Sequence, residues 1–256
     1  MRKVLTGLTL AVAAGAGVAA GARYLSRRQH HWRGVLADAI PVNSAYWREQ
    51  KKKQGDLLYV AIGDSAAQGI GASRPAHSYV GFIARRLREL HPGLRVANLG
   101  ISGATVRIAI EQELPQLRRL QPDILTVCIG ANDIASFDAE RFDRDIRELF
   151  DALPGHAIVA DLPSFYFLPA QKKVHEANRL LRAAASDHGF EVVPLHIRTH
   201  RQGLWGVTTQ FAGDLFHPND RGYRIWADTF LPAVERRLGQ VSRSDATAAQ
   251  SPGSTP

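Results

Sequence analysis

Short runs of apolar residues recur along the middle of the chain, separated by longer stretches in which apolar and polar residues alternate with a helical period. The run Leu57–Ile62 is apolar at every position and stops at Gly63, a pattern typical of a strand that is buried on both faces. Similar runs occupy 94–99, 124–129, 157–160 and 190–194. The sequence therefore predicts five buried strands.

The stretches between these runs indicate helices. Between Tyr79 and Leu90, the apolar residues Val80, Ile83 and Leu87 recur at three- and four-residue spacing. Further helices are predicted over 108–120 (interrupted at Pro115), 139–153, 170–188 and 218–238. Because parallel strands need crossover helices, this alternation predicts an α/β domain whose parallel sheet is covered on both faces. A ligand site is then expected beyond the carboxyl ends of the strands.

Both ends of the chain differ in composition from this domain. Two basic residues precede 4–22, an uncharged stretch rich in Ala, Gly, Leu and Val, so 1–22 is expected to be a signal peptide or a membrane anchor. Residues 23–56 are expected to form a basic linker that includes a helix. The folded domain would cover 57–239, and 240–256, which have little apolar bulk, are expected to be a disordered tail.

The positive charge of the chain lies mostly ahead of the domain. Residues 1–56 hold 10 Lys and Arg against 3 Asp and Glu, whereas 57–256 hold 22 against 21. The near-neutral domain argues against nucleic acid as a partner. The basic stretch either attracts anionic lipid heads, which gives membrane association through the N-terminal segment, or is a solvated run of charge.

The location of the protein follows from the same segment. The apolar stretch favours a secreted or membrane-anchored protein. The arginines that follow it favour the cytoplasmic face of the membrane as the alternative, because positive charge tends to remain on that side.

Cysteine content limits the chemistry. The single cysteine, Cys128, excludes a disulfide framework and a cysteine-based zinc site. Nothing in the sequence points to another metal or to an organic cofactor, and none is expected.

Polar groups suited to acyl transfer follow three of the predicted strands. Ser65, in Gly63-Asp64-Ser65, follows the first strand, where the start of a helix would place its backbone N–H at a positive dipole end. Gly100 and Asn132 follow the second and third strands and offer a backbone and a side-chain donor to an oxyanion. Helix capping by Ser65 and turn formation by the other two are the ordinary alternatives.

A possible base lies late in the chain. Asp214 and His217 are three residues apart, a spacing at which a carboxylate can hold one imidazole nitrogen and leave the other free. A surface histidine ahead of a helix is the alternative.

Taken together and in this order, these segments resemble the SGNH, or GDSL-type, hydrolase family over about 57–238. Ser65 with Gly69 is similar to the first sequence block of that family, and Gly100 in 98–103 to the second. Asn132 is similar to the third block, and Asp214 with His217 to the last. The sequence departs from the family at Ala66, where leucine is usual; this removes a packing group but no catalytic atom.

The resemblance implies a fold and an activity. The fold is a three-layer αβα sandwich with a five-stranded parallel, flavodoxin-like sheet. The activity is that of a serine esterase or lipase in which Ser65 is the nucleophile, His217 the base and Asp214 its partner, with an oxyanion hole formed by Ser65, Gly100 and Asn132.

The resemblance leaves the substrate open. A small-molecule ester of the lipid or acylated-carbohydrate class is expected. An acyltransferase would use the same residues, whereas a non-catalytic binding module is disfavoured because no triad member is missing. The apolar residues of 162–168, with Leu204, Trp205 and Phe211, either line an acyl pocket or pack at loop roots.

Overall fold

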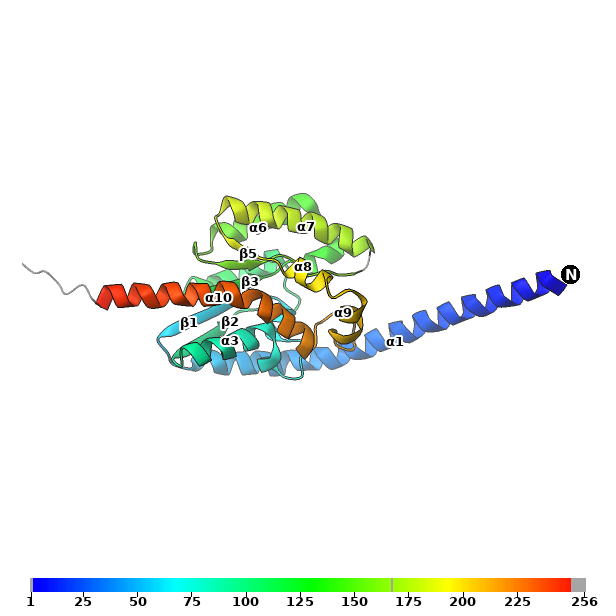
Figure 1. Ribbon diagram of the computed structural model, residues 1–256, viewed down its shortest axis with the longest axis horizontal. Helices are drawn as coiled ribbons and strands as arrows, with labels where there is room; N and C mark the ends of the chain where they lie inside the picture. Colours follow the sequence, from blue (N-terminus) through cyan, green and yellow to red (C-terminus); the bar gives the residue numbers. More distant parts are fainter. Residues whose placement is uncertain (1, 167, 250–256) are drawn as a thin grey trace, which may run out of the picture.

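A five-stranded, all-parallel sheet forms the centre of the protein (Figure 1). The computed structural model describes residues 2–166 and 168–249. The strand order, β2-β1-β3-β4-β5, is that of flavodoxin-like sheets and confirms the α/β fold predicted from the sequence. The strands are β1 (Leu57–Gly63), β2 (Leu94–Asn98), β3 (Ile124–Cys128), β4 (Ile158–Ala160) and β5 (Glu191–Val193).

Helices cover both faces of this sheet, giving three layers (Figure 1). One face is covered by α1 (Arg2–Lys52), α3 (Tyr79–Leu90) and α10 (Asp220–Ala249). The other is covered by α6 (Ala139–Asp151), α7 (Leu168–Asp187) and the segment formed by α4 (Val106–Ile108), η2 (Ala109–Glu113) and α5 (Leu114–Leu117). Short helices α2 (Ser65–Gln68), η1 (Pro75–His77), η3 (Asn132–Ser136), α8 (Leu195–His200) and α9 (Gly203–Thr209) lie in the connections.

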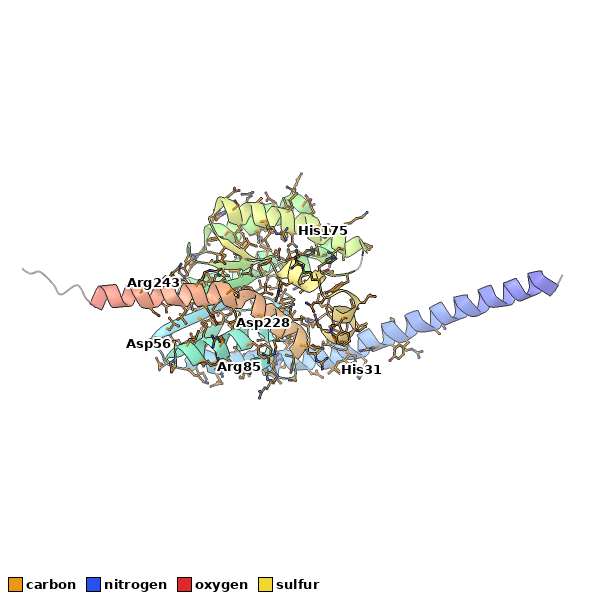
Figure 2. The ribbon with its side chains drawn as sticks, in the orientation of Figure 1. His31, Asp56, Arg85, His175, Asp228 and Arg243 are labelled. Carbon is orange, nitrogen blue, oxygen red and sulfur yellow. The ribbon has the colours of Figure 1, made fainter. Side chains whose placement is uncertain are left out.

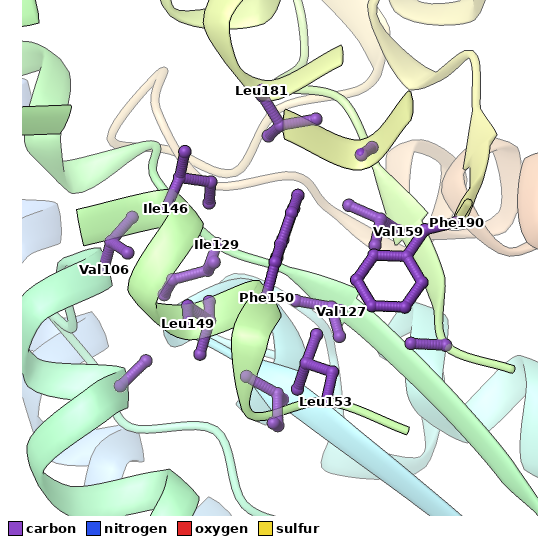
Figure 3. Close-up of a cluster of buried hydrophobic side chains, with 14 of the residues drawn as sticks. Val106, Val127, Ile129, Ile146, Leu149, Phe150, Leu153, Val159, Leu181 and Phe190 are labelled. Atoms are coloured by element: carbon purple, nitrogen blue, oxygen red, sulfur yellow. The ribbon is translucent and has the colours of Figure 1, made fainter. Parts of the chain in front are cut away.

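The two faces of the sheet have separate hydrophobic cores. Alternate residues of β1 point to opposite faces, so Val60 packs in one core and Tyr59 in the other. Figure 3 shows part of the first core, where Phe150 lies among aliphatic side chains of α6 and the strands. The double-sided burial explains why the run 57–62 is apolar at every position.

The helix predicted over 108–120 is divided into three pieces, with a π-helical turn at Ala109–Glu113. Pro115 has no backbone N–H to donate to the carbonyl of Glu111, so the regular helical pattern cannot continue through it. A widened turn ahead of the proline is a common response to such an interruption.

Helix α1 joins two segments that the sequence separates. Residues 1–22 and 23–56 are predicted as a leader and a linker, whereas the structure has one helix over Arg2–Lys52. Its C-terminal part packs on the domain, where Leu36 and Trp47 are buried. Among the described residues, no helix reaches the combination of length and hydrophobicity that crossing a membrane requires. The role of 1–22 stays a prediction.

Helix α10 extends into the stretch for which the sequence predicts disorder. It ends at Ala249, beyond the predicted boundary at 240, and 250–256 lie outside the described residues. Adding residues to an existing helix costs much less than starting one, so the helix continues through a segment that has little apolar bulk of its own.

Candidate active site

Ser65 is the first residue of α2, directly beyond the carboxyl end of β1. Asp64 caps this helix, because its side chain accepts a hydrogen bond from the backbone N–H of Ala66 at 2.9 Å. Burial raises the pKa of Asp64 to about 6, although this hydrogen bond acts in the opposite direction. The cap fixes the turn that presents the Ser65 hydroxyl.

A buried carboxyl group accepts a hydrogen bond from the backbone just before this turn. Glu113 is fully buried, and its Oε2 accepts the backbone N–H of Gly63 at 3.0 Å. Its Oε1 has no hydrogen-bond partner within the described residues. Burial raises the pKa of Glu113 well above its usual range, so the folded protein favours the neutral acid.

Replacing Glu113 with glutamine is expected to make stability less dependent on pH. The glutamine oxygen still accepts the Gly63 N–H. In the parent, the raised pKa of Glu113 stabilises the fold. This contribution is complete at pH values below the pKa of an unfolded glutamate, about 4.3, and is lost as the pH rises through the pKa of the folded state. The thermal midpoint of the variant relative to that of the parent should therefore be higher at pH 8 than at pH 5.

The control for this experiment is Glu111→Gln, because Glu111 is exposed on the same π-helical turn. A stability difference between parent and Glu113→Gln that is the same at pH 5 and pH 8 would contradict the assignment of Glu113 as a buried neutral acid.

Asp214 and His217 lie on the loop between α9 and α10. The Oδ1 of Asp214 accepts the backbone N–H groups of Phe216 and His217, both at 3.1 Å, and its Oδ2 lies 2.6 Å from His217 Nδ1. Burial opposes ionisation of Asp214, but the hydrogen bonds from the imidazole and the two N–H groups outweigh it and lower its pKa. Asp214 is therefore an ionised partner that fixes the imidazole.

The imidazole connects this loop to the serine. His217 Nε2 lies 3.0 Å from Ser65 Oγ, across 152 positions of sequence. Within hydrogen-bond distance, an imidazole held on its far nitrogen by a carboxylate can remove the proton of the hydroxyl. The structure thus brings together the three residues that the sequence predicts as the nucleophile, the base and the carboxylate partner of the base.

Gly100 lies close to α2, but its N–H is already engaged. This N–H donates to Asn98 Oδ1 at 3.0 Å, and the Gly100 carbonyl accepts a hydrogen bond from Gln68 Nε2 at 2.9 Å. A Cβ at this position would lie 2.7 Å from Cβ of Ala67. This corrects the expectation that Gly100 is an oxyanion donor: its role is the close packing of the loop after β2 on α2.

Gly103, in the same loop, offers a backbone N–H that the sequence analysis did not single out. It is exposed, adopts φ of +83°, and its N–H donates to no acceptor within the described part of the chain. Asn132 approaches this loop, because its Nδ2 donates to the carbonyl of Ala104 at 2.9 Å and lies 3.4 Å from Asp64 Oδ2. Asn132 therefore lies between the loop and the nucleophile turn.

An apolar cavity of about 330 Å³ opens at Ser65 and His217. Of the residues predicted as pocket candidates, Pro163, Phe165, Tyr166, Leu204 and Phe211 line it. Leu162 packs in the core instead, Trp205 is 68% exposed, and Phe167 lies outside the described residues. Further walls come from residues that the sequence did not single out: Val207, Leu215, Phe216, Pro218 and Trp226.

Comparison with known proteins identifies the family of the chain. The model of the GDSL-like lipase/acylhydrolase family matches residues 61–225, which contain all three residues of the Ser–His–Asp arrangement. The chain belongs to this family. It is accordingly a serine hydrolase acting on ester bonds. A comparison with curated proteins found no significant match.

Solved structures show the same fold. LAE5, an α/β hydrolase from the metagenome of Lake Arreo, is 25% identical, with a TM-score of 0.60 over 72% of this chain and 98% of that one. A catalytic variant of Axe2, an acetylxylan esterase from Geobacillus stearothermophilus, is 22% identical, with a TM-score of 0.60 over 72% and 96%. A lipolytic protein of the G-D-S-L family from Veillonella parvula is 20% identical, with a TM-score of 0.60 over 71% and 100%.

Replacing Gly71 with alanine is expected to lower kcat/KM for an ester about 100-fold. Gly71 has φ of +94°, and a Cβ there would lie 2.5 Å from the carbonyl oxygen of Pro218 and 2.9 Å from Cβ of His217. The clash displaces the imidazole, and a shift of about 1 Å in a reacting group can cost two orders of magnitude.

The matched control is Gly189→Ala. Gly189 also has a positive φ, +69°, but open space surrounds its Cβ position. Both variants should lose stability from backbone strain, and only Gly71→Ala should lose activity beyond that. Equal activity in the two variants would show that Gly71 does not position His217.

Proposed function

We propose that the protein hydrolyses carboxylic esters of apolar acyl groups through an acyl-enzyme on Ser65. The observation that carries this proposal is the Ser65–His217 contact of 3.0 Å at the edge of a cavity of about 330 Å³ with mostly apolar walls. A nucleophile at the mouth of an apolar cavity is suited to an ester whose acyl chain enters the cavity.

The chemistry proceeds in two halves. His217 takes the proton of Ser65 as the oxygen attacks the ester carbonyl, and Asp214 stabilises the imidazolium that forms. The imidazolium then protonates the leaving alkoxide, which departs as an alcohol. A water molecule then gives a proton to the same imidazole and attacks the acyl-enzyme. The imidazolium returns that proton to Ser65 Oγ as the C–O bond breaks, which releases the carboxylic acid and free Ser65.

Three donors are proposed for the oxyanion: the backbone N–H of Ser65, the N–H of Gly103 and the side-chain amide of Asn132. The first lies at the start of α2, and the second lacks an acceptor within the described residues. The amide of Asn132 is held near both by the Ala104 carbonyl and Asp64. Donors fixed in advance stabilise the developing charge without reorganisation.

The walls of the cavity favour a lipid-class acyl group over an acetylated carbohydrate. Aromatic and aliphatic side chains dominate the lining. Apart from the nucleophile turn and His217, its polar groups are Ser164, Thr199, Gln210 and the hydroxyl of Tyr166. An acetyl group would leave most of this apolar surface without a partner, whereas a longer chain would bury it.

With p-nitrophenyl esters of increasing chain length, kcat/KM is expected to rise about fourfold per added methylene until the cavity is filled. Val207→Phe should move the optimum to shorter chains, because the larger ring occupies part of the cavity. A strict preference for acetate, or an optimum that Val207→Phe does not move, would contradict an acyl chain in this cavity.

A further inference from the structure

Large apolar side chains at the entrance of the catalytic cavity, and on the two short helices beside it, remain exposed to solvent. They are Ile197 on α8, Leu204 and Trp205 on α9, and Phe216 on the loop that carries His217, and together they are called the mouth patch. Leu204 and Trp205 are 84% and 68% exposed. Leu204 and Phe216 also line the cavity, and Trp205, next to Leu204 on α9, lines a neighbouring hollow with Arg224 and Asp228. Exposed apolar surface next to a site marks a place where a partner binds.

The segment that carries the patch is basic. Residues 195–224 contain four arginines and two aspartates. Asp214 holds His217 and Asp220 bonds to His77 and Ser73, so neither carboxylate pairs with Arg198 or Arg201. Arg198 and Arg201 are exposed, and neither forms an ion pair within the described residues. A partner of this face is therefore expected to be anionic as well as apolar.

Helix α1 leaves the domain at the same end. Arg28 Nε donates to the carbonyl of Gly213 at 3.1 Å, and a Cβ on Gly213 would lie 2.0 Å from the ring of Trp32. From there the N-terminal half of α1 projects away from the domain on the side of α9, whereas α10 ends on the opposite side (Figure 1). Figure 2 labels His31 at the point where α1 passes α9. The projecting part carries exposed Arg23, Arg27 and Tyr24 next to the domain.

We propose that this end of the molecule docks on an anionic phospholipid bilayer. Leu204 and Trp205 enter the boundary between headgroups and acyl chains, and Arg198 and Arg201 contact the headgroups. The proposal rests on the proposed function, in which the acyl chain of an ester enters the cavity. In the docked orientation the cavity opens toward the lipid, so the acyl chain enters it without crossing water. A second copy of the chain fits less well, since a symmetric contact through this patch brings arginines against arginines.

The test measures contact of Trp205 with lipid in the full-length chain carrying Ser65→Ala, so that binding is measured without hydrolysis. Vesicles of 70% phosphatidylcholine and 30% phosphatidylglycerol are prepared with and without bromine on the acyl chains, which quenches nearby indole fluorescence. Comparison with a Trp205→Phe variant isolates the emission of Trp205 from that of the other three tryptophans. The Trp205 emission is expected to shift to the blue and to fall at least twofold with brominated lipid.

Substitutions extend the test to affinity and to activity. Trp205→Ser should weaken vesicle binding about tenfold, and Arg198→Gln with Arg201→Gln about fivefold per residue. Leu90→Ser is the matched control, because Leu90 is exposed at the end of α3 that precedes β2, away from the cavity. In the enzyme with Ser65 intact, Trp205→Ser should slow hydrolysis of a vesicle-embedded ester and leave that of a soluble short-chain ester within twofold.

Three results would overturn the docking surface. The first is Trp205 emission that brominated vesicles do not change. The second is equal vesicle affinity in Trp205→Ser and Leu90→Ser. The third is a patch variant that changes the oligomeric state instead of vesicle affinity, which would make the patch a contact between copies. Because the binding assays use Ser65→Ala, failure of the docking proposal is separable from failure of the hydrolase assignment.

Discussion

Ser65→Ala is expected to lower kcat for p-nitrophenyl esters by about 10⁴-fold or more. Without the hydroxyl there is no acyl-enzyme, and only binding and the oxyanion donors remain to stabilise the transition state. The loss of one small buried atom leaves α2 and its Asp64 cap in place. The thermal midpoint should therefore remain within a few degrees of the parent.

Ser186→Ala is the control for this measurement, because Ser186 is exposed on α7, away from the cavity. It should hydrolyse the same esters at the parent rate. Turnover by Ser65→Ala within tenfold of the parent, in a preparation free of other esterases, would refute the assignment of Ser65 as nucleophile.

Asp214→Asn is expected to lower kcat/KM by about 10⁴-fold, nearly as much as loss of the serine. An asparagine side chain can present its N–H to His217 Nδ1, which favours the tautomer whose proton faces Ser65 and cannot act as a base. The substitution also removes the charge that stabilises the imidazolium.

The pKa of Asp214 is lowered in the fold, so the carboxylate stabilises the folded state. This contribution is present above the pKa of an unfolded aspartate, about 3.9, and is lost as the pH falls through the pKa of the folded state.

A second Asp–His pair provides the control. Asp220 Oδ2 lies 2.7 Å from His77 Nδ1, so Asp220→Asn breaks a similar contact that does not include Ser65. It should change stability and leave kcat/KM within about fivefold of the parent. If the two variants lose activity equally, Asp214 has no special role in orienting the base.

The sequence predicts those parts of the fold that depend on local pattern. The helix expected over 79–90 is α3 with the same bounds, and each predicted strand is present to within two residues at either end. Helix α3 is strongly periodic and β1 to β4 are mostly buried, so the hydrophobic pattern specifies them, whereas β5 is a three-residue edge strand with Glu191 exposed. The short helices α8 and α9 were missed because one or two turns cannot establish a helical period.

The C-terminal part of α1 shows a different limit. The charge-rich pattern predicts a basic linker with a helix over 23–56. It does not predict that two side-chain N–H groups of this segment attach it to the domain. Asn43 Nδ2 and Trp47 Nε1 both donate to the carbonyl of Gln68, at the end of the helix that carries Ser65. Contacts between residues more than 20 positions apart leave no periodic signal in either segment, so only the folded structure reveals them.

The active site was predictable in its side chains and not in its backbone. Ser65, Asn132, Asp214 and His217 are each placed by the end of a strand or by a three-residue spacing. The proposal of Gly103 in place of Gly100 as oxyanion donor rests on the hydrogen bond from the Gly100 N–H to the side chain of Asn98. From the sequence alone the two glycines cannot be distinguished, because glycine has the same conformational freedom at either position.

The central claim is that Ser65 is the nucleophile activated by His217, and covalent labelling tests it most directly. The full-length protein is treated with a fluorophosphonate and analysed by intact and peptide mass spectrometry. One adduct per chain is expected, on the peptide that contains Ser65, with none in Ser65→Ala and much slower labelling in Asp214→Asn. An adduct on a different serine, or labelling of Ser65→Ala at the parent rate, would contradict the account.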